Sequence, residues 1–222
     1  YYEEALRKDP GDFRVNTAIG RLYLMRGMFE EAEAHLLRAV ARAGKDYTRP
    51  KDGEALYYLG VASRFLGKAA EAEEAFGRAS WEAGWTAAAA AQMAELAAGR
   101  GRYLEALEQA ERSVATNVSD RRARDIKATL LRKLGRLEEA EQTARRSLAA
   151  DPLDFWAANE LCLIESARGF EKDSDELAAG LELKMRDAAE NYLELASDYA
   201  ACGLYAEAVT VLSRLANGPA AG

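Results

Sequence analysis

Residues 121–154 read RRARDIKATLLRKLGRLEEAEQTARRSLAADPLD, and this stretch decides the fold. Gly135 divides it into two segments rich in Leu, Ala, Glu and Arg, all of which favour helix. A glycine suits this position because the chain must take a left-handed conformation where the first helix ends. Asp151-Pro152 closes the second segment, since a residue before proline resists helical geometry. The stretch therefore predicts two antiparallel helices joined at Gly135.

The same arrangement recurs along the chain every 34 residues. The glycines of the series are Gly67, Gly101, Gly135, Gly169 and Gly203. Small residues follow each glycine by five positions and let the paired helices approach closely; they are Ala72, Ala106, Ala140, Ser174 and Ala208. Gly27 belongs to the series with an insert of 6 residues before Gly67. The sequence therefore predicts a stack of helical hairpins.

The repeats resemble the tetratricopeptide repeat, whose period is about 34 residues. The resemblance rests on three sets of residues: Ile19-Gly20, Tyr23, Gly27, Phe29, Ala32, Leu36 and Ala39; Leu56, Leu59-Gly60, Gly67, Ala72, Phe76 and Ala79; and Tyr192, Leu195-Ala196, Tyr199, Gly203, Tyr205, Ala208 and Leu212. It implies an all-α fold, an α-α superhelix of about six hairpins plus a partial N-terminal helix. The motif is specific to the architecture and carries no particular function.

We expect a single solenoid domain over residues 1–222. Its predicted parts are the tail of a truncated repeat at 1–10, repeats at 13–46, 53–86, 87–120 and 121–154, a degenerate repeat at 155–188 and a last repeat at 189–217. We expect the second helix of the degenerate repeat to run from Asp175 to Asp187. The polar insert around 45–52 is either an interaction loop or tolerated extra length. Both ends look cut, so we expect a fragment of a longer protein.

Bulk composition limits the possible functions. A formal net charge of -7 argues against nucleic-acid binding, which needs a basic field. Cys162 and Cys202 lack metal or redox spacing and are expected to be small, reduced core residues of a cytoplasmic protein. No stretch of sequence is long and apolar enough to predict a membrane span. Trp81 and Trp85 flank Gly84. Large aromatics beside a loop can form a partner site, but we expect these two to plug a helix junction.

Residues suited to catalysis do not converge in this sequence. His35 is the single histidine and has no partner that completes a triad or a metal template, so we expect a surface or boundary residue. The paired glutamates recur with the repeat, at the start of each second helix, where they complement the helix dipole. We therefore predict no catalytic residues, no metal, no cofactor and no enzymatic activity.

The resemblance also implies that the first helix of each hairpin lines a concave groove, through its second, fifth, ninth and twelfth positions. This register nominates Arg14, Arg21, Tyr57, Arg64, Arg122, Asp125, Arg132, Trp156, Asn159 and Leu163 as groove residues. Five of them are arginines, whose guanidinium forks suit carboxylates. A groove for an acidic, extended or helical segment of a protein or peptide is one interpretation. The other is that the arginines are solvated or paired with neighbouring carboxylates.

Three functions remain open at this stage. The first is an interaction scaffold for a separate protein or for another domain of the same chain. The second is a non-catalytic accessory region of a carbohydrate-active enzyme. Residues 128–136, 151–154 and 191–199 resemble the helical tail of bacterial multidomain proteins whose β-rich N-terminal domain is similar to carbohydrate-active enzymes. The third is a homo-oligomerisation module, such as a homodimer.

Overall fold

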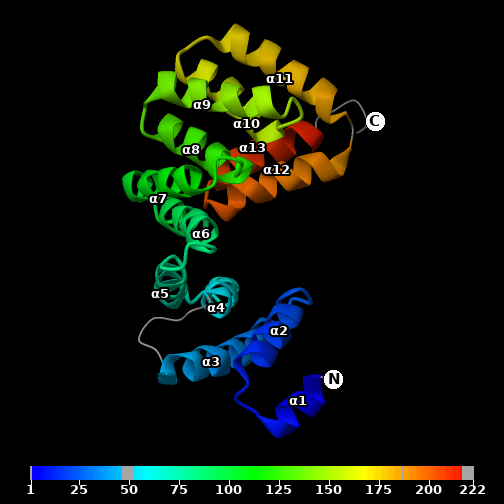
Figure 1. Cartoon of the computed structure of the whole chain (residues 1–222). Helices are drawn as coiled ribbons and strands as arrows, with labels where there is room; N and C mark the ends of the chain where they lie inside the picture. The colour runs from blue at the N-terminus through cyan, green and yellow to red at the C-terminus, as the bar shows by residue number, and fades with distance from the viewer. Residues whose placement is uncertain (1, 47–52, 187, 217–222) are drawn as a thin grey trace. The chain divides into compact units, whose positions relative to one another are not determined.

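The computed structural model describes residues 2–46, 53–186 and 188–216. They form helices without a strand (Figure 1). The thirteen helices among the described residues are α1 (Tyr2–Lys8), α2 (Phe13–Leu24), α3 (Phe29–Asp46), α4 (Glu54–Phe65), α5 (Ala69–Ala79), α6 (Thr86–Gly99), α7 (Tyr103–Thr116), α8 (Arg121–Lys133), α9 (Leu137–Ala150), α10 (Phe155–Ala167), α11 (Glu171–Met185), α12 (Ala189–Ala201) and α13 (Tyr205–Ala216). This confirms the all-α fold with six hairpins and one N-terminal helix.

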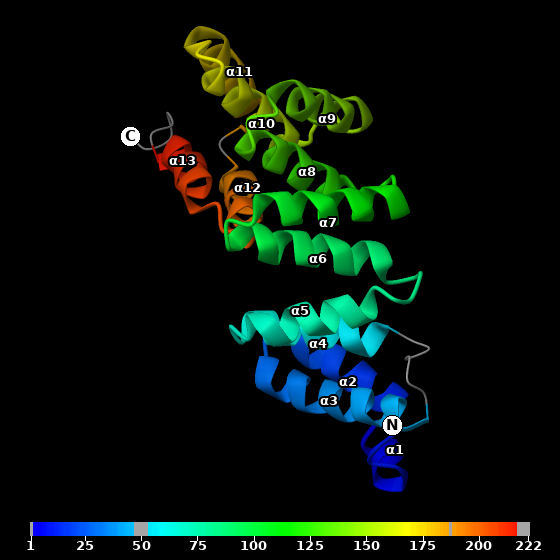
Figure 2. The ribbon, with the colours of Figure 1, turned by 90° about the vertical axis from the view of Figure 1, so that its left-hand side faces the viewer.

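The chain forms two compact units, residues 1–93 and 94–222. Unit 1 contains α1 to α5 and the first half of α6, and unit 2 contains the rest. Within each unit, paired helices such as α2 and α3 or α8 and α9 pack against each other as hairpins (Figure 2). A single domain over 1–222 with the repeat bounds given above stays a prediction.

The glycine series ends the first helix of every hairpin as expected. All six glycines have φ between 70° and 82°, a region that side chains with a Cβ seldom adopt. At Gly135 the amides of Gly135 and Arg136 donate to the carbonyls of Arg132 and Leu131, both over 2.9 Å. These bonds satisfy two carbonyls that the end of the helix leaves without partners. The glycine positions of the sequence therefore fix where each chain reversal occurs.

Aspartate side chains begin three of the first helices. Asp12, Asp120 and Asp154 each accept a hydrogen bond of 3.0 Å from the backbone amide three residues later. Such caps satisfy an amide that has no partner within the helix and typically stabilise it by about 1 kcal/mol. The start and the end of these helices are thus both set locally.

Small residues of the first helices face large residues of the second helices. A Cβ at Gly20 would stand 2.6 Å from Cγ of Leu36, and one at Gly60 would stand 2.6 Å from the Phe76 ring. Leu36 and Phe76 are fully buried. The two helices of a hairpin therefore approach closely because glycine leaves room for the side chain opposite.

The core of unit 2 is one continuous cluster that draws on every helix from the second half of α6 to α13. It includes Trp156 and Leu161 of α10 and Tyr199 and Leu195 of α12. Both cysteines are reduced and buried, as expected. Small residues at the predicted positions, such as Ala106 and Ala140, are fully buried in it.

Three expectations need correction or fall outside the described residues. The second helix of the degenerate repeat begins at Glu171, four residues earlier than predicted. The negative charges of Glu171 and Asp173 stabilise its first turn by complementing the helix dipole. Leu177 of this helix is 40% exposed. Of the expected insert, residues 45 and 46 extend α3, and 47–52 lie outside the described residues. Trp85 packs on Tyr57, but Trp81 is 61% exposed and does not plug the junction.

Candidate functional site

In unit 1 the structure brings Arg14 and Arg21 together at one pocket. The pocket measures about 170 Å³ and is lined by Phe13, Arg14, Thr17, Ala18 and Arg21 of α2 and by Glu54 of α4. The Arg14 guanidinium lies 5.8 Å from the centre of the Phe13 ring, and its side chain is exposed. Arg21 reaches Glu54 over 3.2 Å, with half of its side chain still in solvent. Two guanidinium groups therefore face solvent beside an aromatic ring.

The two other predicted residues of unit 1 lie apart from this pocket. Tyr57 belongs to an aromatic cluster with Tyr58, Phe76 and Trp85. The ring centres of Tyr57 and Trp85 lie 5.0 Å apart. Arg64 donates to Oε1 of Gln92 over 2.6 Å. His35 is half-buried, stacks on Tyr23 and lies 2.9 Å from Oδ1 of Asn16. Burial and Arg38 lower the pKa of His35, which therefore favours the neutral ring.

In unit 2 the predicted arginines both hold carboxylates of the last hairpin, α12–α13. Arg122 of α8 donates to Glu95 of α6 over 2.8 Å and to Asp198 of α12. Its guanidinium also lies 5.6 Å from the centre of the Trp156 ring. Burial opposes the charge, but Glu95 and Asp198 raise the pKa of Arg122 above its ordinary value. Arg122 is thus a fixed cation between two helices.

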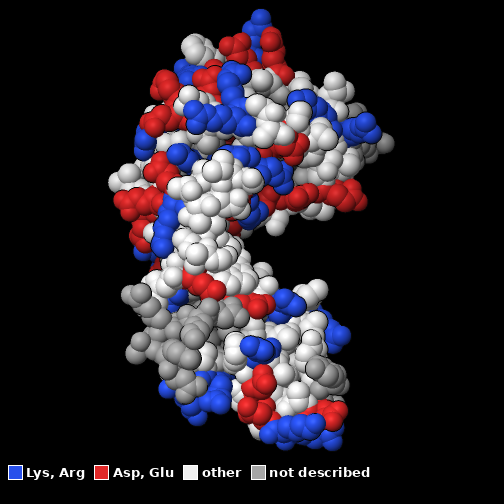
Figure 3. All heavy atoms as spheres, viewed as in Figure 1, with Lys and Arg blue, Asp and Glu red and all other residues white. Residues whose placement is uncertain are grey.

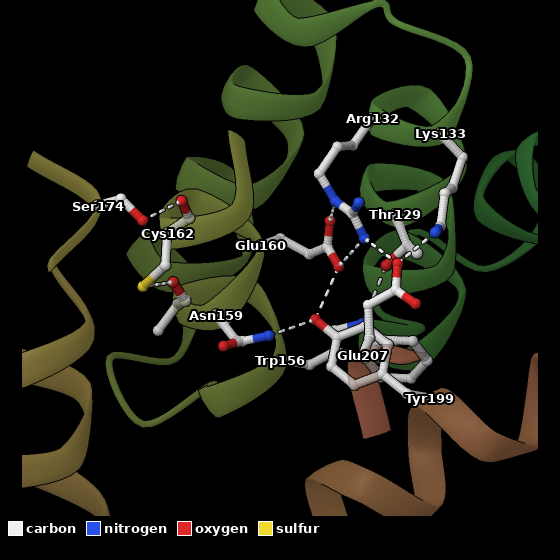
Figure 4. Close-up of polar contacts among 11 residues, drawn as sticks. Thr129, Arg132, Lys133, Trp156, Asn159, Glu160, Cys162, Ser174, Tyr199 and Glu207 are labelled. Atoms are coloured by element: carbon white, nitrogen blue, oxygen red, sulfur yellow. Dashed lines mark hydrogen bonds and ion pairs between the residues drawn. The ribbon is translucent and has the colours of Figure 1, made fainter. Parts of the chain in front are cut away.

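Arg132 stands at the centre of a second, more buried group of contacts (Figure 4). It donates hydrogen bonds to Glu160 of α10 from Nε over 2.7 Å and from Nη2 over 3.3 Å. Nη2 also donates to Glu207 of α13 over 3.1 Å. Lys133 pairs with the same Glu207. Although burial works against it, Lys133 and Arg132 hold the pKa of Glu207 below its ordinary value. Two cations of α8 therefore neutralise one carboxylate of the last hairpin.

Trp156 and Asn159 of α10 extend these contacts towards α12. The Trp156 indole donates to Thr129 over 2.9 Å, and its ring lies 5.4 Å from that of Tyr199. Asn159 donates to the Tyr199 hydroxyl over 2.8 Å and accepts from Arg214 of α13 over 2.6 Å. The Tyr199 hydroxyl donates in turn to Glu160 over 2.7 Å. Burial and the Glu160 carboxylate raise the pKa of Tyr199, so it stays a donor.

We call these residues the arginine network: Arg122, Arg132, Lys133, Trp156, Asn159 and Glu160 on α8 and α10, with Asp198, Tyr199, Glu207 and Arg214 on α12 and α13. Register alone identified Arg122, Arg132, Trp156 and Asn159. It missed Asp198, which lies on a first helix outside the predicted inward positions, and Glu207, which lies on a second helix. Neither the 34-residue spacing nor the helical pattern signals a contact between helices so far apart in the chain.

Asp125 and Leu163 complete the predicted set. Leu163 is half-buried against the core of unit 2. Asp125 is 2% exposed and accepts from the Ser147 hydroxyl over 2.8 Å. Burial and the neighbouring Asp154 carboxylate raise the pKa of Asp125 to about 8. A protonated Asp125 supplies a donor for buried Asp154, whose Oδ2 has no other hydrogen-bond partner within the described residues. Binding of a partner by the ten nominated residues stays a prediction.

A second pocket, of about 340 Å³, lies where α12 meets α8 and α10. Arg121, Phe155 and Trp156 line one side of it, and Asn191 and Glu194 line the other. On the face shown in Figure 3, basic and acidic side chains of the described residues are interspersed. No group of three His, Cys, Asp or Glu side chains within 2–46, 53–186 and 188–216 could hold a metal ion. None of the helices described is both long and apolar enough to cross a membrane.

Similar proteins of known structure share this fold. A tetratricopeptide repeat protein from Parabacteroides merdae aligns with a TM-score of 0.69 at 22% identity, over 96% of this chain and 78% of that chain. MamA from Desulfovibrio magneticus aligns with a TM-score of 0.68 at 22% identity, over 79% and 96%. PilW, a type IV pilus biogenesis factor, aligns with a TM-score of 0.67 at 20% identity, over 92% of both chains.

Two family models described as tetratricopeptide repeat match residues 1–57 and 91–155, which together make up more than half of the chain. Arrays of such repeats are in general non-catalytic scaffolds that bind other proteins through extended surfaces. With its left-handed glycines, its paired helices and these matches, the chain belongs to the tetratricopeptide repeat family.

Proposed function

We propose that this chain is a protein-interaction scaffold whose first-helix arginines bind the carboxylates of an acidic partner segment. The observation that supports the proposal most strongly is internal to unit 2. There, Arg122 and Arg132 each hold a carboxylate that a helix far along the chain supplies. These positions of the repeat thus accept acidic side chains from a helical element. Charge-assisted contacts of this kind are stronger than neutral hydrogen bonds.

Unit 1 offers the same chemistry in an open form. Arg14 and Arg21 line one pocket, and each keeps much of its side chain in solvent. The Phe13 ring beside Arg14 adds an apolar surface for the stem of a bound side chain. We therefore place the first contact with an acidic segment at this pocket.

The test uses a fluorescein-labelled decapeptide of alternating Glu and Leu, with a Lys and Leu peptide as the charge-reversed probe. We expect the acidic peptide to bind and Arg14→Glu with Arg21→Glu to weaken binding by about tenfold or more. The affinity should also fall as the salt concentration rises from about 50 to 500 mM, because exposed charges are screened.

A matched control carries Arg26→Glu and Arg38→Glu, which change the net charge equally at exposed positions outside the pocket. Equal losses in the two double variants would show a general charge effect and reject the pocket. Thermal unfolding of both variants establishes that each is folded at the temperature of the measurement.

A further inference from the structure

The last hairpin, α12–α13, contacts helices beyond the neighbouring hairpin of the stack. In a repeat array each hairpin is expected to contact the hairpins beside it. Here Arg122 and Asp198 are 76 residues apart, and Arg132 and Glu207 are 75 apart. α12 and α13 therefore lie along the face made by α8 and α10, as both ribbon views show (Figures 1 and 2). This is the face that the repeat register assigns to a partner.

The arginines of this face have two sets of partners. One carboxylate comes from the stack itself: Glu95 for Arg122 and Glu160 for Arg132. The other comes from the last hairpin, as Asp198 and Glu207. If the hairpin leaves, each guanidinium keeps a paired carboxylate. The face thus avoids the large cost of burying a charge without a partner.

One edge of the contact between the hairpin and α8 and α10 is polar and incompletely filled, whereas Tyr199 and Leu195 pack into the core of unit 2. Asp198 and Arg122 keep 25% and 40% of their side-chain surfaces in solvent, so their ion pair is partly screened. The pocket of about 340 Å³ separates Phe155 and Trp156 from Asn191 and Glu194 at the same contact. This pocket is open to solvent, so water reaches this edge of the contact. This edge of the contact therefore differs from the dry packing within a hairpin.

The connection to the hairpin holds backbone strain. Arg186, directly after α11, has φ of 55° and ψ of -160°, and it is the one non-glycine residue with positive φ among the described residues. This combination is adopted almost only by glycine. If release of the hairpin allows Arg186 to relax, this strain favours movement at the connection between α11 and α12.

We propose that α12–α13 is an internal ligand of the face made by α8 and α10, and that an acidic helical segment of a protein partner replaces it. That segment presents carboxylates to Arg122 and to Arg132 with Lys133, and an aromatic side chain to Trp156. All of these residues belong to unit 2, and none of them lines the pocket of Arg14 and Arg21. Binding at this face requires the hairpin to leave first, which lowers the apparent affinity of the partner.

The first measurement is hydrogen exchange of the wild-type chain, followed by mass spectrometry. We expect the amides of 189–216 to exchange about tenfold faster or more than those of 121–167, because the hairpin opens while α8 to α10 stay folded. Asp198→Asn with Glu207→Gln should speed exchange in 189–216 only. Glu182→Gln with Glu190→Gln, a pair of exposed carboxylates on α11 and α12, is the control and should change neither segment.

The second measurement uses a fluorescein-labelled peptide of residues 189–216 as the probe. We expect it to bind the Asp198→Asn and Glu207→Gln chain about tenfold more tightly than the wild type, whose own hairpin competes at a high effective concentration. A peptide with the same two substitutions should not bind. Equal binding to both chains, or none to either, would overturn the proposal.

If the chain with Asp198→Asn and Glu207→Gln fails to fold, as judged by circular dichroism, hydrogen exchange of the wild type tests whether the hairpin opens separately from the rest of unit 2. Exchange in 189–216 as slow as in 121–167 shows that the hairpin opens only with the rest of unit 2, and this result rejects an exchangeable hairpin. Loss of decapeptide binding in unit 1 would leave the outcome unchanged, since no residue is shared.

Discussion

Gly203 of the last hairpin lies against Gly99 at the end of α6. A Cβ at position 203 would stand 2.5 Å from Cα of Gly99, a distance at which the backbone must shift. Gly203 also has φ of 70°. One glycine therefore serves two purposes: it reverses the chain between α12 and α13, and it allows the hairpin to reach α6.

The first prediction separates these two purposes. Gly135→Ala places a side chain at φ of 75° with no atom within 4 Å, so it reports the conformational cost alone, about 1 kcal/mol. Gly203→Ala adds the clash with Gly99 and should cost about 1–3 kcal/mol more. Urea unfolding of both variants measures the difference. Equal midpoints would mean that Gly203 does not hold the hairpin to α6.

The second prediction concerns the buried pair of Arg132 and Glu160. Glu160 is fully buried and Arg132 is 10% exposed, so Glu160→Ala leaves a buried guanidinium with one carboxylate fewer. We expect a loss of about 3–5 kcal/mol in the free energy of unfolding. As a comparison, Glu141→Ala removes a partner of Arg145, whose side chain is 65% exposed, and of Arg168.

Glu141→Ala should shift the urea midpoint less than Glu160→Ala does, since the pairs of Glu141 keep more contact with solvent than the pair of Arg132 and Glu160, and partly solvated ion pairs contribute little. Similar shifts for the two substitutions would show that the Arg132 pair is not the centre of the network. A double-mutant cycle with Arg132→Met would then measure the coupling energy directly.

The third prediction is a pH dependence. The folded chain holds the Asp125 proton up to about pH 8, whereas in the unfolded chain Asp125 loses it near 3.8. Between these values the folded state binds more protons, so the stability of unit 2 should fall as pH rises from about 4 to 8. The slope is at most about 1.4 kcal/mol per pH unit. Above pH 8 the folded and the unfolded chain have both lost the Asp125 proton, so Asp125 causes no further change in stability with pH.

Asp125→Asn keeps a donor towards Asp154 and an acceptor for Ser147 but cannot titrate. The substitution should reduce the loss of unfolding free energy with rising pH. Relative to the wild type, the variant should therefore be more stable at pH 8 than it is at pH 5. Chemical denaturation at several pH values measures this. An unchanged slope in the variant would assign the pH dependence to other groups.

The fourth prediction uses the two buried thiols as reporters. Cys202 lies at the end of α12, next to Gly203, and Cys162 lies on α10; each is 1% exposed. Burial raises the pKa of Cys162, which slows its reaction further. Opening of the last hairpin should therefore expose Cys202 before Cys162.

Alkylation under native conditions, followed by mass spectrometry of the peptides, measures the order. We expect Asp198→Asn with Glu207→Gln to accelerate labelling of Cys202 and to leave Cys162 at its wild-type rate. If both thiols speed up together, the substitutions loosen unit 2 as a whole instead of its last hairpin.

Local chemistry accounts for what could be predicted from the chain. Gly135 and Asp151-Pro152 determine where helices turn and end, because these residues restrict their own backbone. Asp120 and Asp154 begin helices through a bond to an amide three residues away. A period of 34 residues then carries the same hairpin along the chain. The fold class and the position of each chain reversal follow from these short-range effects.

Only the tertiary structure decided which arginines form ion pairs and which carboxylates they bind. Arg14 and Arg122 occupy similar places in their repeats, yet Arg14 is exposed and Arg122 holds Glu95 and Asp198. The difference arises because the last hairpin returns to α8 and α10, over 75 residues or more. Neither helical periodicity nor repeat register encodes such a contact. It depends on shape and charge complementarity that exist only after the hairpins have stacked.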